Sequence, residues 1–287
     1  MADGPSNWLI TGVSSGIGRA LAEAALAEGH RVAGTVRKAE QIGDVERLAP
    51  GRATGVVLDV TSSDSVEAGV RQALDALGGR VDVLVNNAGW GLVGAVEETS
   101  DAEARDVFDT NFFGQLNIVR AVLPTLRAQG SGHIFAASAI GGFTGVPGLG
   151  VYSAAKAAVD VMNEAVAQEV APFGIKVTIL TLGIFRTNFA SSSLKETSAR
   201  IAAYDDGPSG KFRGFIGQLT GKQPNDPVRA AQAILKAAAA DNPPLHLPLG
   251  QDALGVIGKK IAGLQADVAA WHDTAASVVF PDAQAGS

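Results

Sequence analysis

The chain of 287 residues contains no cysteine. This absence excludes a disulfide framework, a thiol nucleophile and a metal site built from thiolates. The four histidines are also scattered along the chain, without the spacing of metal ligands. They are His30, His133, His246 and His272, and we expect each at the surface or at an edge of the structure. The sequence therefore predicts no metal site.

Clustered positive charge and long apolar runs are missing as well. The formal net charge is −6, and no block of lysine and arginine stands out, which argues against a nucleic-acid partner. No segment is long and apolar enough to span a bilayer, and the first residues, MADGPSN, lack the basic start and apolar run of a signal peptide. We expect a cytoplasmic protein with no membrane partner.

The order of predicted elements indicates the fold class. Short β-branched runs alternate with helical patterns, which is typical of βαβ units and a parallel sheet. Strands are predicted at 7–11, 31–37, 55–60, 81–89, 133–138, 175–183 and 244–250. Helices are predicted at 18–29, 61–77, 102–129, 152–171, 226–241 and 252–278. The sequence predicts an α/β fold, a Rossmann-type doubly wound parallel sheet with helices on both faces.

No compositional break divides the chain, so residues 1–287 are interpreted as a single Rossmann-fold domain. The regular pattern weakens over about 185–225, after a predicted strand end where such folds place ligand-covering loops. We expect this substrate loop region to select the substrate. Residues from about 252 to 280 form a C-terminal helical extension, which either covers the site or joins an interface.

The segment TGVSSGIGRA follows the first predicted strand and leads into a helix. Glycines in such a turn let backbone N–H groups approach a pyrophosphate, and the helix N-terminus faces its negative charge. The turn therefore predicts a dinucleotide site. Its candidate binding residues are Gly12, Ser14, Ser15, Gly16, Ile17 and Gly18.

Two further motifs accompany the glycine turn: NNAG at 86–89, and Tyr152 followed four residues later by Lys156. Together the three motifs resemble the short-chain dehydrogenase/reductase family in order and separation, over about residues 7–248. The resemblance implies a nicotinamide cofactor. It places Asp59 and Val60 at the adenine, Asn86 to Gly89 at the adenine ribose side, and Thr187 at the carboxamide. The candidate cofactor contacts outside the glycine turn are Arg37, Lys38, Asp59, Val60, Asn86, Ala88, Gly89, Tyr152, Lys156, Gly183 and Thr187.

The end of the second predicted strand bears on the choice of cofactor. An acidic residue there holds the ribose 2′-hydroxyl of NAD, whereas a basic residue accommodates the 2′-phosphate of NADP. The sequence has Arg37 and Lys38 at this point, with no acid until Glu40. We predict a preference for NADP(H), with NAD(H) as the alternative.

Tyr152 and Lys156 share a helix face because they are four residues apart. A cation about 5 Å from a phenol contributes on the order of 3 kcal/mol at an effective dielectric of 20, or roughly two pKa units. We expect Lys156 to lower the pKa of Tyr152. The resemblance implies hydride transfer to a carbonyl carbon, with Tyr152 exchanging the proton on oxygen. It also assigns Asn111, in DTNFFG, to a relay that supports the lysine through water.

The sequence departs from the family pattern at two positions. The usual substrate-binding serine lies thirteen residues before the tyrosine, where this chain has Ala139, and the neighbouring hydroxyl is Ser138. Adjacent residues of a strand point to opposite faces, so either the following loop turns Ser138 inward or Tyr152 works without a serine. Leu182 stands where the family has proline before Gly183.

Three functions remain open at this point. The first is an NADP(H)-dependent oxidoreductase that interconverts a ketone and a secondary alcohol, with Tyr152, Lys156, Asn111 and Ser138 as candidate catalytic residues. The second is a cofactor-binding sensor or scaffold with weak catalysis, and the third is a reductase of C=N substrates. A set of large side chains suggests a hydrophobic substrate: Trp90, Phe143, Val146, Leu149, Phe185, Phe189 and Tyr204. The resemblance also suggests a homodimer or homotetramer built on the two long helices.

Overall fold

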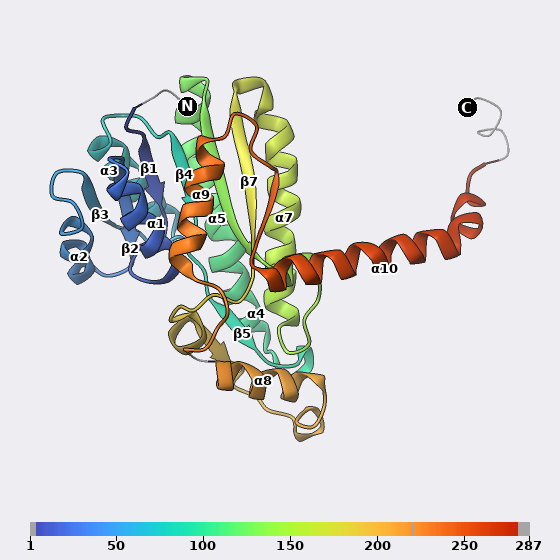
Figure 1. Cartoon of the computed structure of the whole chain (residues 1–287). Coiled ribbons are helices and arrows are strands. Elements are labelled where there is room, and N and C mark those ends of the chain that lie inside the picture. Colours follow the sequence, from blue (N-terminus) through green and yellow to red (C-terminus); the bar gives the residue numbers. More distant parts are fainter. Residues whose placement is uncertain (1–3, 220, 281–287) are drawn as a thin grey trace.

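A seven-stranded parallel sheet forms the centre of the computed structural model, which describes residues 4–219 and 221–280 (Figure 1). The strand order is β3-β2-β1-β4-β6-β7-β9, and every neighbouring pair is parallel. The strands are β1 (Asn7–Ile10), β2 (Arg31–Val36), β3 (Ala53–Val57), β4 (Val83–Asn86), β6 (Gly132–Ala139), β7 (Ile175–Leu182) and β9 (His246–Leu249). This arrangement confirms the predicted Rossmann-type sheet.

Helices cover both faces of the sheet. The first face carries α1 (Gly16–Ala27), α2 (Ile42–Glu46) and α9 (Pro227–Ala239), whose apolar side chains share one core cluster with β1 and β2. The second face carries α3 (Ser63–Ala76), α5 (Gly114–Gln129) and α7 (Gly150–Val170). The strands between them are almost wholly apolar, as expected for a parallel sheet buried on both faces.

Several elements differ from the sequence prediction. The helix predicted over 102–129 is divided into α4 (Asp101–Phe108) and α5 by a π-helical turn, η3 (Asp109–Phe113). The substrate loop region contains a short strand and a helix that no periodic pattern announced. These are β8 (Leu194–Glu196), which pairs with β5 (Gly91–Val93), and α8 (Pro208–Leu219). The remaining short elements are η1 (Ala39–Gln41), η2 (Val96–Glu98), α6 (Ile140–Phe143), η4 (Ala171–Phe173), η5 (Phe189–Ser193) and η6 (Ala202–Tyr204).

The order of strands places a crevice at the sheet's carboxyl edge. The chain moves outward from β1 to β2 and β3, then returns to β4 on the other side of β1, so the winding direction reverses there. Ligands of such sheets bind at this switch point, beyond the carboxyl ends of the strands. Helix α8 lies beyond that edge, and α10 (Gln251–Ala276) projects away from the body (Figure 1).

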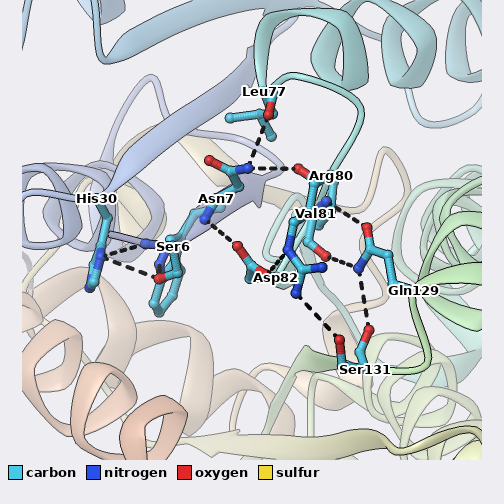
Figure 2. Close-up of polar contacts among 10 residues, drawn as sticks. Ser6, Asn7, His30, Leu77, Arg80, Val81, Asp82, Gln129 and Ser131 are labelled. Atoms are coloured by element: carbon cyan, nitrogen blue, oxygen red, sulfur yellow. Dashed lines mark hydrogen bonds and ion pairs between the residues drawn. The ribbon is translucent and has the colours of Figure 1, made fainter. Parts of the chain in front are cut away.

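The opposite, amino edge of the sheet is tied together by polar side chains (Figure 2). The Asp82 carboxylate accepts a hydrogen bond from the Asn7 backbone N–H at 2.8 Å and one from Arg80 Nε at 2.7 Å. Gln129 brackets the backbone of Val81, accepting from its N–H at 3.0 Å and donating to its carbonyl at 2.7 Å. These contacts fix the starts of β1 and β4.

His133 corrects one sequence expectation, because it is buried in the middle of the sheet rather than exposed. Its Nε2 lies 2.9 Å from Thr178 Oγ1 on β7, and the Thr178 hydroxyl itself donates to the Pro244 carbonyl at 2.7 Å. Nε2 therefore carries the proton. Burial, with a further contribution from the charge of Lys176, lowers the pKa of His133 from 6.5 to about 3.

This burial predicts an acid-dependent loss of stability. Between pH 6.5 and 3 the unfolded chain binds a proton at His133 that the folded chain does not, so stability falls as the pH falls. His133 should remove roughly 3 kcal/mol of unfolding free energy between pH 7 and pH 4. His133→Gln should abolish that part of the loss, measured by urea unfolding at both pH values. The exposed His272→Gln is the control, and an unchanged acid loss in His133→Gln would contradict the prediction.

Among the described residues no helix is both long and apolar enough to cross a membrane. The same residues hold no group of three or more histidine, aspartate or glutamate side chains that could bind a metal ion.

Candidate active site

The glycine turn lies between the end of β1 and the start of α1. Gly12 and Gly16 have φ values of 73° and 64°, a left-handed conformation that favours glycine. A Cβ on Gly18 would lie 2.4 Å from both Asn87 Nδ2 and the Gly12 carbonyl oxygen, so α1 could not approach the turn with any other residue there. The three glycines thus build the close-approach turn that the sequence predicted.

Residues 86–89, at the end of β4 and just after it, are hydrogen-bonded to this turn. The Thr11 hydroxyl oxygen accepts hydrogen bonds from the backbone N–H groups of Asn87 and Ala88, at 2.9 and 3.0 Å. Asn87 Nδ2 donates to the carbonyls of Thr11 and Gly12, at 2.9 and 3.0 Å. These bonds join the two central strands at the switch point. Asn86 lies just before them, with its side chain buried.

The segment after β2 forms the outer part of the site. Arg37 and Lys38 are exposed at the strand's carboxyl end. A cavity of about 320 Å³ lies between the glycine turn and the segment after β2. It is lined by Ser14, Arg19, Gln41, Asp44, Val45, Arg47 and Leu48. It contains two guanidinium groups, each paired with an acid on its own segment, Arg19 with Glu23 and Arg47 with Asp44.

Asp59 and Val60 follow β3. The Asp59 carboxylate accepts from the backbone N–H and the hydroxyl of Thr61, at 2.9 and 2.8 Å, so its side chain is occupied within its own turn. Val60 is buried and packs over Gly114, where a Cβ would lie 2.6 Å from Val60 Cγ2. The structure places both residues at the carboxyl edge, next to β2 and α5.

Tyr152 and Lys156 lie on the first turns of α7 and are 7% and 4% exposed. Lys156 Nζ lies 5.8 Å from the centroid of the Tyr152 ring and donates to the Ala137 carbonyl at 2.9 Å. The Tyr152 hydroxyl makes no hydrogen bond to a described residue, which leaves it free for a ligand. The structure therefore brings the predicted phenol and amine together on one helix face.

The direction of the Tyr152 pKa differs from the sequence expectation. Burial raises the pKa of Tyr152 above its ordinary value of 10.0, because the phenolate would lose its hydration there. Burial also lowers the pKa of Lys156 to about 8, against an opposing effect of the Asp160 charge. In the protein alone, Tyr152 is therefore a neutral phenol at pH 7.

Asn111 occupies the π-helical turn η3, a feature that often marks functional positions. Its Nδ2 donates to the carbonyls of Trp90 and Val107, at 2.8 and 2.9 Å. Its buried Oδ1 has no hydrogen-bond partner among the described residues. A Cβ on Gly89 would lie 2.6 Å from that oxygen and 3.5 Å from Lys156 Nζ, so the amide and the ammonium face the same glycine.

The structure places Ser138 and Ala139 on opposite sides of β6. The Ser138 hydroxyl points toward α7, where it lies 3.5 Å from the Lys156 carbonyl and hydrogen-bonds Asp160. Burial raises the pKa of Asp160 to about 6, although that hydrogen bond acts to lower it. Ala139 instead packs against the apolar cluster that contains Tyr152. The methyl group, not the hydroxyl, is therefore on the side of the phenol.

Gly183 and Thr187 follow β7 and cross back toward the glycine turn. The Thr187 side chain would lie 3.6 Å from a Cβ on Gly16, so this segment closes over the first turn of α1. A Cβ on Gly183 would overlap the Asp252 carboxylate at 2.3 Å. Leu182, where the family pattern has proline, ends β7 and packs against the core of the α1 face.

Sequence reasoning missed the side chains that hold this segment. Asp252 Oδ2 accepts from the Ile184 backbone N–H at 2.7 Å, and Asn225 Nδ2 donates to Asp252 Oδ1 at 2.8 Å. Glu98 and Arg213 form a buried ion pair at 2.7 Å that attaches α8 to η2. Burial opposes the charge on Glu98, but the backbone N–H groups of Ile201 and Ala95 and the guanidinium hold its pKa below the usual range.

The large side chains expected at the substrate pocket divide into two sets. Trp90 and Leu149 pack against the cluster around Tyr152, and the Phe189 ring lies 6.3 Å from the Tyr152 ring. Phe185 packs instead against the core beneath α1 and α9, because it follows β7 on that face. Tyr204 is directed to the Glu97 carboxylate at 2.6 Å. Phe143 and Val146 lie in α6 and the turn after it.

The sequence model of the short chain dehydrogenase family matches residues 6–198. The chain belongs to this family. It is similar to the oxidoreductase BOA17 of Botryotinia fuckeliana, 38% identical over 93% of this chain and 96% of that protein. It is also similar to a 3-ketodihydrosphingosine reductase of Bacteroides thetaiotaomicron, 40% identical over 86% of this chain and 88% of that protein.

Solved structures agree with the sequence comparison. A short-chain dehydrogenase from Streptomyces avermitilis is 41% identical with a TM-score of 0.89, over 96% of this chain and 100% of that chain. A short chain dehydrogenase from Burkholderia cenocepacia, in complex with NADP, is 27% identical with a TM-score of 0.73, over 94% and 98%. The protein is therefore an oxidoreductase of the short-chain dehydrogenase family, whose structural neighbours bind nicotinamide cofactors.

Proposed function

We propose that the protein is an NADP(H)-dependent oxidoreductase that interconverts a ketone and a secondary alcohol by hydride transfer. The observation that carries this proposal is the free hydroxyl of Tyr152, which stands beside Lys156 at the same carboxyl edge as the glycine turn. A phenol held there, with no structural hydrogen bond to give up, is available to exchange a proton with a substrate oxygen.

The residues present fit a dinucleotide. Gly12 and Gly18 let the turn pack closely against residues 87–88, and the N-terminus of α1 follows directly after the turn. Asn86, Ala88, Gly89, Gly183 and Thr187 border the same edge, and Asp59 and Val60 flank it. When bound, the cofactor supplies or accepts the hydride.

Tyr152 is proposed as the proton donor in reduction and the acceptor in oxidation. Because burial keeps it a neutral phenol at pH 7, Tyr152 carries the proton that reduction of a carbonyl requires. Lys156 holds positive charge beside the ring and stabilises the phenolate that then forms. The free Oδ1 of Asn111 would accept a hydrogen bond from a water that also contacts Lys156 Nζ. Through this water a proton would return to Lys156 and Tyr152.

We propose a substrate with a large apolar part. Trp90, Leu149 and Phe189 present apolar surface around Tyr152, and Ala139 adds a methyl group there instead of a hydroxyl. The relative from Bacteroides thetaiotaomicron is a 3-ketodihydrosphingosine reductase, and reduction of a ketone agrees with this chemistry. Residues of about 185–225, including η5 and α8, would cover that part of the substrate.

The experiment that tests this function is NADPH oxidation over a panel of aliphatic, aromatic, alicyclic and long-chain ketones. Turnover that rises with the apolar size of the ketone is expected. Silence over the whole panel, with NADPH bound, would reject the proposal. A cyclic imine belongs in the panel, because Ala139 at the phenol side favours C=N reduction as a second candidate function. A protein that binds NADPH but reduces neither class would be a sensor or scaffold.

The preference for NADP(H) gives a prediction at Arg37. An arginine that meets a phosphate makes charge-assisted hydrogen bonds, so Arg37→Gln should raise the Kd of NADPH about tenfold to a hundredfold. The Kd of NADH should change less than about threefold. Arg31→Gln, at the exposed amino end of the same strand, is the matched control. Equal effects on both cofactors in a fluorescence titration would assign Arg37 no role in the preference.

The remaining assignments are also proposals. We propose that residues 1–287 act as one Rossmann-type unit in the cytoplasm, with a small carbonyl or alcohol as substrate and without nucleic-acid or membrane partners. A homodimer or homotetramer would use the exposed faces of α5 and α7. Phe113, directly before α5, and Val161, in α7, are 46% and 65% exposed. Sedimentation equilibrium of the full chain measures that state.

A further inference from the structure

Helix α10 carries an apolar stripe that the other described residues leave largely exposed. The helix has 26 residues, a length of about 39 Å at 1.5 Å per residue, and it projects from the body (Figure 1). Every residue from 261 to 280 is exposed. The exposed fractions are 43% for Ile261, 48% for Leu264, 67% for Val268 and 66% for Trp271.

The apolar residues follow the spacing of a coiled-coil seam. They are Leu254, Ile257, Ile261, Leu264, Val268 and Trp271, which alternate in steps of three and four residues. This heptad pattern keeps one apolar line on a helix that packs lengthwise against another helix. A helix that only capped its own body would need apolar residues near its base, whereas here the seam runs to the far end.

The rest of the helix indicates that a partner supports it. Gly255, Gly258 and Gly263 lie within α10, and a Cβ on any of them would meet nothing within 4 Å. Glycine is the least favourable residue in a helix interior apart from proline. Each of these glycines weakens the isolated helix relative to alanine, and helices in proteins gain most of their stability from packing of an apolar face.

We propose that α10 pairs in antiparallel orientation with α10 of a second copy of this chain. With Ile261 opposite Leu264 of the second copy, Ile257 falls opposite Val268 and Leu254 opposite Trp271. Each layer then joins two apolar seam residues, and the two-fold axis repeats it. This interface is distinct from the long-helix faces of the proposed oligomer and does not depend on the reaction.

Charge selects the antiparallel orientation. Lys260 and Asp267 flank the seam on one side, and they lie about 10 Å apart along their own helix, too far to pair within it. In the antiparallel register Lys260 faces Asp267 of the second copy, and the symmetry axis makes this pair twice. In a parallel register Lys260 would face Gln265 instead. The other flank carries Gly258, Gln265 and His272, with no like-charge conflict.

Length and charge also favour a second copy over a lipid surface. The midpoint of the register lies about 12 residues from the base of α10 and about 14 from its end, so each helix reaches the second body at 1.5 Å per residue. Helices that lie on membranes carry many lysines and arginines on the polar face. Within α10 the cations are Lys259 and Lys260, against Asp252, Asp267 and Asp273.

The first test is the mass of the full chain by sedimentation equilibrium. Ile261→Asp with Leu264→Asp should halve the mass of the assembly while the Kd of NADPH stays unchanged. Lys259→Glu, on the outer side of the helix, is the matched control and should leave the mass unchanged. An unchanged mass in the Asp double variant, or a wild type that is already a monomer, would overturn the proposal.

The second test is a charge exchange. Lys260→Glu and Asp267→Lys should each weaken the α10-dependent association about tenfold, because two attractive pairs become repulsive. The variant with both changes should regain the wild-type dissociation constant. A double variant that stays as weak as the single ones would exclude the antiparallel register. Binding of a monomeric wild type to phosphatidylserine vesicles, lost in the Asp double variant, would instead assign α10 to a membrane surface.

Discussion

Replacing Tyr152 by phenylalanine is expected to lower kcat for ketone reduction by about 10²- to 10⁴-fold, the usual contribution of a positioned acid or base. The change removes the proton donor and little else. Phenylalanine keeps the ring contacts with Leu92, Val107 and Ala155, and the lost hydroxyl has no hydrogen-bond partner among the described residues. The measurement is steady-state NADPH oxidation with the best ketone of the panel.

The chain supplies a matched control, because it contains two tyrosines. Tyr204→Phe removes a hydroxyl that bonds Glu97 in the loop region and should change kcat less than about threefold, within the range of a surface hydrogen bond. The Kd of NADPH, measured by fluorescence, should stay the same in both variants. A Tyr152→Phe protein that retains full turnover would remove Tyr152 from the chemistry and with it the proposed mechanism.

Motifs within short stretches of chain predicted much of the site. A helix places residues four apart on one face, so the pairing of Tyr152 with Lys156 follows from spacing alone. The glycine turn follows in the same way, because the strand, turn and helix are consecutive. The sheet was predictable because each strand is a short apolar run and parallel strands must alternate with helices.

Features that depend on distant parts of the chain were not predictable. The sequence predicted His133 at the surface or at an edge of the structure. In the structure it lies in β6, between β4 and β7. The raised pKa of Tyr152 comes from burial by segments that no local pattern reveals. Asp252 and Asn225 hold the segment after β7 although they come from separate regions of the chain.

At Ser138 and Ala139 the side chains still alternate between the two faces of β6. The sequence left open whether the following loop could turn Ser138 toward the phenol. In the structure β6 continues through Ala139, so the alternation is kept and Ser138 faces the Lys156 carbonyl and Asp160. The glycines after the strand form α6 and do not shift the register.

Ala139→Ser is accordingly expected to raise kcat for ketone reduction by up to about a hundredfold. A hydroxyl at this position would stand on the phenol side of β6 and could donate to the oxygen on which charge develops. One such donor contributes about 3 kcal/mol to the barrier, which is about a hundredfold in rate. Serine differs from alanine by one atom, and the position is only partly buried, so the fold should tolerate it.

Ser138→Ala is the matched control for that substitution, one residue away on the other side of the same strand. Its hydroxyl contacts α7 rather than the phenol, so kcat should change less than about threefold, while stability falls by roughly 1 kcal/mol as Asp160 loses a hydrogen bond. If Ser138→Ala loses a hundredfold and Ala139→Ser gains nothing, Ser138 is the donor and β6 must rearrange when substrate binds. Ala139→Ser could also raise ketone reduction and leave cyclic imine reduction unchanged. The alanine would then suit a C=N substrate, whose reacting atom needs no hydroxyl donor. The C=N reaction would replace ketone reduction as the assigned chemistry only if the wild type also reduced the cyclic imine faster than every ketone of the panel.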